Sequence, residues 1–158
     1  MKELIDKYVK DIFGNLEIPE TEEEKKQLAR EVFGKNLVNI LDGWLEVAFD
    51  FVDNPKPEEP FIRENESSRR DKAFRNTFKN LDAQTKEKIK ELITDTATGL
   101  LFSTLVSFDQ FDYGLLKITL SPKTADNLDE KWSITEEGLN LHDELDEWIE
   151  NYSNQEKK

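Results

Sequence analysis

The only histidine of the chain, His142, stands among carboxylates near the C-terminus. On a helix it would lie one turn from Asp146, and Asp143 would lie one turn from Glu147, so an imidazole and several carboxylates could in principle meet a divalent cation. Any acidic helix produces such pairs, however, and no further ligands occur at a recognisable spacing. We therefore expect no metal site, and we interpret His142 as a residue on a solvated helix face.

Nucleophilic and cofactor-dependent chemistry lacks its usual residues in this sequence. The absence of cysteine excludes thiolate catalysis, thiolate metal sites and disulfides. A serine triad would have to use His142, and no Gly-x-Ser-x-Gly elbow occurs. No P-loop, no Gly-x-Gly-x-x-Gly and no His-Glu-x-x-His motif occurs either. We predict no catalytic residues and no cofactor, and hence a protein that is not an enzyme.

Acidity is the strongest global property of the chain, whose formal net charge is −13. Residues 1–60 carry −7, residues 61–95 carry +2 and residues 96–158 carry −8. Such a charge distribution repels nucleic acid and anionic lipid, and it speeds the encounter with cationic proteins. We predict a basic protein partner, no membrane association and no nucleic-acid binding. The alternative interpretation is that the acidity only keeps the protein in solution.

Length and composition predict one folded domain in a reducing compartment. A chain of 158 residues with ten Phe, three Trp and three Tyr can bury one core. The N-terminal residues 1–14 lack the apolar region of a signal peptide, and no stretch reaches the ~20 apolar residues of a membrane span. The length and the aromatic content predict a single domain over residues 1–152. The absence of cysteine, of a signal peptide and of a membrane span predicts a cytoplasmic protein.

Apolar residues recur at helical spacing over most of the chain. Thr21 and Glu24 have capping-box spacing and are expected to open a short helix that stops before Gly34. The three prolines of residues 54–60 predict a loop inside the domain. Besides the helix opened at Thr21, we expect helices over residues 4–13, over residues 37–52 and from a cap at Ser67 or Ser68.

The longest predicted helix runs from an N-cap at Asp82 to Phe108. Its apolar residues cover two faces, so we expect it to be buried on two sides as the central helix. Gly99 inside it is expected to pack closely against a neighbour, because glycine otherwise weakens a helix.

After the long helix the period changes to that of strands. Residues 113–121 and 131–135 predict a β-hairpin, followed by a C-terminal helix over residues 139–152 and a disordered tail over residues 153–158. The predicted fold class is mainly α: a compact helical domain of about six helices around a long central helix, with one small β-hairpin before the C-terminal helix.

Two clusters of charge are candidate binding residues. The polar face of the C-terminal helix and the neighbourhood of the hairpin supply carboxylates for a basic partner: Asp143, Asp146, Glu147, Glu150, Asp109 and Asp112. The basic segment before the long helix could dock an anion through Arg69, Arg70 and Arg75, but we favour the alternative that these side chains pair with the protein's own carboxylates.

The segment from Leu100 to Trp148 resembles part of winged-helix transcription regulators. It presents an apolar helix, a strand, a polar loop and then Trp132-Ser133-Ile134-Thr135-Glu136-Glu137-Gly138 before the last helix. The resemblance implies a regulator, but residues 96–111 contain no Lys or Arg, so this helix lacks the side chains that grip DNA. A regulator of this origin would act through protein contacts.

A second resemblance is to small bacterial immunity-protein-like domains. It is carried by the segment Arg75-Asn-Thr-Phe-Lys-Asn-Leu81 and by the pattern Leu-x-x-Glu-Leu-x-x-Trp-Ile at residues 141–149. This resemblance implies a compact binding protein that neutralises a toxin. The expected function is therefore a non-enzymatic acidic binding protein, an immunity or inhibitor protein for a basic partner, with the winged-helix regulator as the alternative.

Overall fold

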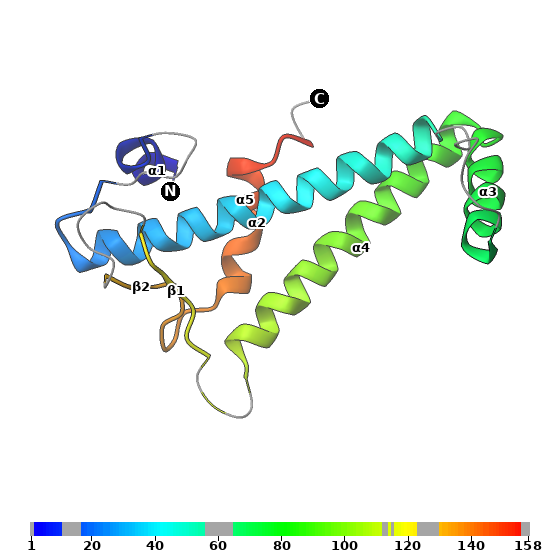
Figure 1. Cartoon of the computed structure of the whole chain (residues 1–158). Helices are drawn as coiled ribbons and strands as arrows, with labels where there is room; N and C mark the ends of the chain where they lie inside the picture. Colours follow the sequence, from blue (N-terminus) through cyan, green and yellow to red (C-terminus); the bar gives the residue numbers. More distant parts are fainter. Residues whose placement is uncertain are drawn as a thin grey trace. The chain divides into compact units, whose positions relative to one another are not determined.

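The structure is a computed structural model that describes residues 2–10, 17–55, 65–111, 114, 116–122 and 130–155 (Figure 1). Its elements, in chain order, are α1 (Lys2–Tyr8), α2 (Glu22–Asp53), α3 (Glu66–Lys79), α4 (Ala83–Asp109), β1 (Thr119–Leu120), β2 (Trp132–Ser133), the 3₁₀ helix η1 (Leu141–Glu144) and α5 (Leu145–Tyr152). The predicted fold class is confirmed: the described chain is mainly helical, with a long central helix and a small antiparallel hairpin before the C-terminal helix.

Two compact units divide the chain. Unit 1 comprises residues 1–40 and 100–158, and unit 2 comprises residues 41–99, so α2 and α4 each contribute to both. Of the predicted proline-rich loop at residues 54–60, only Asn54 and Pro55 belong to the described residues. None of the helices in the described ranges is long and apolar enough to cross a membrane.

The long helix α2 begins at the predicted cap. The backbone N–H of Glu24 donates to Oγ1 of Thr21 at 3.2 Å, which satisfies one of the free donors of the first turn. The predicted end before Gly34 is wrong, because the helix continues for 32 residues to Asp53 (Figure 1). Gly34 is instead a contact site: a Cβ atom there would overlap the indole ring of Trp148 from α5.

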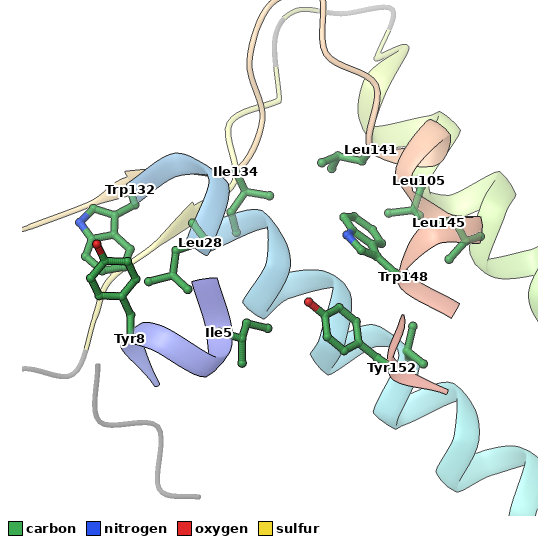
Figure 2. Close-up of a cluster of buried hydrophobic side chains, with 12 residues drawn as sticks. Ile5, Tyr8, Leu28, Leu105, Trp132, Ile134, Leu141, Leu145, Trp148 and Tyr152 are labelled. Carbon is green, nitrogen blue, oxygen red and sulfur yellow. The ribbon is translucent and has the colours of Figure 1, made fainter. Parts of the chain in front are cut away.

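Unit 1 has one apolar core to which α1, α2, α4, the hairpin, η1 and α5 all contribute (Figure 2). Trp148 is fully buried at its centre, and Phe33 of α2 meets its ring edge-on at 6.1 Å. The buried members are Ile5, Tyr8, Leu28, Ala29, Val38, Leu105, Trp132, Ile134, Leu141, Leu145, Trp148 and Tyr152.

The hairpin pairs Thr119 with Ser133 and Leu120 with Trp132 in antiparallel register. The side chain of Thr135 extends this pairing, because its hydroxyl donates to the carbonyl of Leu116 at 3.0 Å and accepts from the N–H of Ile118 at 3.0 Å. The pairing puts the ring of Trp132, which is 2% exposed, into the core of unit 1. Beyond α5 the N–H of Ser153 still donates to the carbonyl of Ile149 at 2.9 Å.

Unit 2 is held by aromatic contacts and a salt bridge. Phe78 of α3 packs edge-on against Phe51 of α2 at 5.4 Å and stacks with Phe74 at 5.9 Å. Lys90 of α4 binds Asp53 of α2 at 2.6 Å. These contacts join all three helical segments of the unit.

The caps of α3 and α4 test two further predictions. Asp82 caps α4 as predicted, since the N–H of Thr85 donates to its carboxylate at 2.9 Å. The prediction of Ser67 or Ser68 as the cap of α3 is wrong: Asn65 is the N-cap, and Ser68 is the third helical residue that closes the capping box with it. Asparagine and serine are both common N-cap residues. Here the first of the two in the chain, Asn65, is the cap, and Ser68 hydrogen-bonds back to it.

Burial of α4 on two sides is also wrong. Leu105 is the buried residue among those described in α4, whereas Leu92, Leu100 and Phe102 are 63%, 69% and 45% exposed. The core of unit 1 uses one face of this helix only. Close packing at Gly99 is not observed either, since a Cβ atom added there would meet nothing within 4 Å.

The two glycines of α2 give a matched test of the Trp148 contact. Gly34→Ala should lower the free energy of unfolding by about 1–3 kcal/mol, because the added methyl group collides with a buried indole. Gly43→Ala should raise it by about 0.5–1 kcal/mol, because Gly43 faces open space in the same helix. Urea denaturation measures both, and equal effects of the two substitutions would contradict the packing described here.

Candidate functional site

The C-terminal helix α5 has two faces of opposite character. Leu145, Trp148 and Tyr152 are buried against the core of unit 1. The predicted contact residues Asp146, Glu147 and Glu150 lie between them in sequence and are exposed. Helical spacing thus separates an apolar face that anchors the helix from a carboxylate face that meets solvent.

Several carboxylates near the start of α2 and in the hairpin are paired with neighbouring cations. Lys25 binds Glu130 of the hairpin at 2.7 Å and Glu22 at 2.9 Å. Lys26 binds Glu136, and Arg30 approaches the same carboxylate at 3.4 Å. The hydrogen bond from Lys25 lowers the pKa of Glu130, and that from Lys26 lowers the pKa of Glu136. The carboxylates of Glu130 and Glu136 are therefore already paired within unit 1.

The outer face of α5 lacks such cations. Asp146, Glu147 and Glu150 form no ion pair with any residue of the described ranges. Arg30, which also approaches Glu136, lies 3.5 Å from the partly buried carboxylate of Glu144. Burial raises the pKa of Glu144, and the charge of Arg30 opposes that effect. We define the acidic face as Asp143, Asp146, Glu147 and Glu150.

His142 lies at one edge of the acidic face, and the prediction that it is a surface residue is wrong. Its side chain is 14% exposed, and Nδ1 donates to Oδ2 of Asp109 at 2.7 Å. The backbone N–H of His142 donates to the same oxygen at 3.0 Å. On the other side Nε2 lies 3.4 Å from Oδ1 of Asp143. This arrangement ties η1 to the end of α4.

The two aspartates predicted near the hairpin have different outcomes. The side chain of Asp109 is only 2% exposed, so its carboxylate holds His142 instead of facing a partner. Asp112 lies outside the described residues. Phe102 of α4 is 45% exposed, and its ring meets the imidazole of His142 edge-on at 5.3 Å.

The predicted anion-binding residues lie on α3 in unit 2. Arg69 and Arg70 are exposed there. Arg75 is partly buried and interacts with another group of the protein.

A buried polar cluster in unit 1 was not predicted. Glu31 of α2 is 0% exposed, and neither carboxyl oxygen has a hydrogen-bond partner of good geometry among the described residues. Burial raises the pKa of Glu31 to about 7, against smaller opposing effects of the Ile5 backbone and Gln27. The buried hydroxyl of Tyr152 likewise has no hydrogen-bond partner among the described residues. Burial and the charge of Glu31 raise the pKa of Tyr152.

One sequence signal could have revealed Glu31. It follows Leu28 by three positions and precedes Gly34 by three, so helical spacing puts it on the face that packs against Trp148. Its charge argued against a core position, and only the tertiary contacts of α5 place it there.

The described residues offer little else for ligand chemistry. They contain no group of three or more His, Cys, Asp or Glu side chains that could hold a metal ion. An open depression of about 490 Å³ borders the hairpin and is lined by Lys117, Ser133, Thr135, Glu136, Glu137, Gly138 and Leu139. Its hydroxyls already serve internal hydrogen bonds, as Ser133 donates to the Thr135 carbonyl at 2.6 Å.

Comparisons of the chain with protein-family models, with curated proteins and with solved structures give no match.

Removal of the Asp109 carboxylate should destabilise the protein. Asp109→Ala leaves the backbone N–H and Nδ1 of His142 without their acceptor in a buried place, which should cost about 2–3 kcal/mol of unfolding free energy. Asp143→Asn, at a side chain that is 66% exposed, should change it by less than about 0.5 kcal/mol. Thermal and urea unfolding measure both variants. An unfolding free energy unchanged by Asp109→Ala would contradict this account.

Glu31 should make stability fall as pH rises. Its pKa is higher in the folded chain than its ordinary value of 4.5, so its contribution is fully present below about pH 4.5 and is lost as pH approaches 7. The loss is at most about 1.4 kcal/mol for each pH unit. Urea unfolding at about pH 5 to pH 8 covers the range of this shift. Glu31→Gln should remove the part of the pH dependence of the unfolding free energy that comes from Glu31. A wild-type profile identical to that of the variant would contradict it.

Proposed function

We propose that this chain is a binding protein whose acidic face engages a basic protein partner. The observation that carries the proposal is the contrast in neutralisation: Asp146, Glu147 and Glu150 have no cationic partner in the described residues, while Glu130 and Glu136 do. Exposed carboxylates on one well-anchored helix gain most from a cationic surface that approaches them. They would also speed its diffusional encounter.

An aromatic side chain adjoins the acidic face. Phe102 is partly exposed and contacts His142, which in turn lies beside Asp143. Interfaces typically combine an aromatic anchor that loses its water with a charged rim. We therefore include Phe102 in the proposed contact surface and leave out Asp109, whose carboxylate is buried.

Among binders of basic proteins, we propose an inhibitor that neutralises a toxin such as a nuclease. The support is the similarity of residues 75–81 and 141–149 to immunity-protein-like domains, together with the charge of the acidic face. A nuclease needs a cationic surface for its substrate backbone. Carboxylates that cover this surface would compete with the substrate.

Neutralising the acidic face should abolish capture of the partner. The immobilised wild-type chain should retain a basic protein from the native host. The immobilised variant Asp146→Asn, Glu147→Gln, Glu150→Gln should not retain it. The wild-type complex should dissociate as ionic strength rises, because exposed charge pairs are screened by salt. Mass spectrometry of the eluates compares the two.

The matched control removes the same charge from unit 2. Glu66→Gln, Glu91→Gln, Asp95→Asn changes three exposed carboxylates on α3 and α4, and it should retain the partner as the wild type does. Equal loss from both triple variants would mean that only net charge matters. Retention by the α5 variant would rule out the acidic face.

The hairpin favours a second candidate function. It lies in sequence between α4 and η1, as a wing does in winged-helix regulators. Because residues 96–111 contain no Lys or Arg, such a regulator would act through protein contacts, and duplex DNA should give no mobility shift at low salt. A mobility shift would contradict action through protein contacts alone and would indicate a DNA-binding regulator.

A further inference from the structure

A carboxyl group lies in the core of unit 1 between α1, α2 and α5. Glu31 of α2 is 0% exposed, and its two oxygens have no hydrogen-bond partner of good geometry among the described residues. Both neighbouring helices reach it: the Ile5 backbone of α1 favours its ionised form, and burial together with its charge raises the pKa of Tyr152 on α5. Figure 2 shows Ile5 and Tyr152 beside α2. A carboxylate in such a place is strongly disfavoured, so the closed core requires the protonated form.

The charges around Glu31 do not compensate an ionised carboxylate. Burial raises the pKa of Glu31 to about 7, the positive amino terminus of the chain and Gln27 oppose this shift, and Glu147 of α5 adds to it. Asp6 of α1 brings a further negative charge to the cluster. Arg30, which precedes Glu31 in α2, is paired with other carboxylates. Ionisation of Glu31 therefore weakens the packing around it.

Of the two helices that cover Glu31, α1 is held less firmly. It has seven residues, which is too short for a helix to be stable alone, and it is fixed by the burial of Ile5 and Tyr8 and by the bond from the Tyr8 hydroxyl to Glu24 at 3.2 Å. In contrast, α5 has the indole of Trp148 fully buried against the backbone of Gly34. Water therefore reaches the Glu31 carboxyl at least cost when α1 moves.

We propose that α1 is a pH-dependent cover of unit 1, closed over Glu31 while that carboxyl is protonated and opened when it ionises. Opening would hydrate the carboxylate and expose the apolar side of α1, formed by Ile5 and Tyr8. This device does not depend on the partner proposed for the acidic face.

The direction of the effect follows from the two states of Glu31. Its pKa is raised in the closed form and returns toward 4.5 in the open form, so its contribution to closure is fully present below about pH 4.5 and is lost as pH rises to about 7. The ratio of open to closed chains should rise by up to about tenfold for each pH unit in this range and level off above it.

The carboxylate of Glu24 acts on α1 in the opposite direction. Hydrogen bonds from Lys7 and Tyr8 lower the pKa of Glu24, so its hold on α1 is present above its ordinary pKa of 4.5 and is lost only as pH falls below that value. Measurements above about pH 5 therefore leave Glu24 ionised throughout and report the change at Glu31.

Amide hydrogen exchange of the full chain, followed by NMR from about pH 5 to about pH 7.5, tests the cover. The reporters are the N–H of Val9, which donates to the Ile5 carbonyl at 2.9 Å, and the N–H of Glu17, which donates to the Tyr8 carbonyl at 2.9 Å. After correction for the intrinsic pH dependence of exchange, their protection should fall by up to about tenfold for each pH unit up to about pH 7. The N–H of Ser153 at the end of α5 is the internal reference and should keep its protection.

Two variants assign the effect to one carboxyl. Glu31→Gln keeps a neutral group of the same shape, and its reporter protection should not change with pH. Glu147→Gln is the matched control, because it removes an exposed carboxylate from the same neighbourhood and should leave the pH dependence in place. In the wild type the side-chain carboxyl carbon of Glu31 should titrate over the same pH range as the loss of protection, a measurement that requires no variant.

Four outcomes would overturn the proposal. The first is reporter protection that stays constant over this pH range, and the second is an equal loss at Ser153, which would mean that unit 1 opens as a whole. The third is a pH dependence that persists in Glu31→Gln, as it would if the amino terminus, which titrates at about pH 8, were responsible. The fourth is a Glu31 carboxyl that titrates at its ordinary value while α1 stays closed.

Discussion

The contact between the indole of Trp148 and the backbone of Gly34 determines how α5 is held. Because Gly34 has no side chain, the largest residue of the core lies directly on α2, and Phe33 closes the edge of its ring. Leu145 and Tyr152 follow Trp148 into the same core at helical spacing. The opposite face of α5 is thereby fixed toward solvent, and with it the carboxylates of the acidic face. A buried apolar contact thus decides which charges are displayed.

Charge is distributed by pairing as much as by sequence. The three cations in the first part of α2 bind carboxylates of α2, of the hairpin and of η1, so these carboxylates are paired within the folded chain. Asp146, Glu147 and Glu150 of the acidic face lack such cations in the described residues. The proposed contact surface therefore combines exposed carboxylates with an aromatic side chain, Phe102.

Local signals in the sequence were enough for the helical fold class, the hairpin and the cap at Asp82, because period and hydrogen bonds within a few residues decide them. They were not enough for the continuous helix α2 or for the cap of α3. Close packing was expected at Gly99 but is found at Gly34. The sequence could not separate the two, since a glycine in a helix has the same local effect whether an indole or solvent faces it. His142 was misplaced because its partner, Asp109, lies 33 residues away in the chain. The outer face of α5 was predictable from spacing, but its lack of counter-charges could be seen only in the structure.

The central claim is that Asp146, Glu147 and Glu150 on the outer face of α5, which have no cationic partner among the described residues, form a contact surface for a basic protein. An NMR titration of the side-chain carboxyl carbons with an oligolysine peptide tests it most directly. The account predicts that the signals of Asp146, Glu147 and Glu150 shift first and furthest, while those of Glu130 and Glu136, already bound to lysines, change little. Equal shifts at both groups of carboxylates, or larger ones at Glu130 and Glu136, would contradict it.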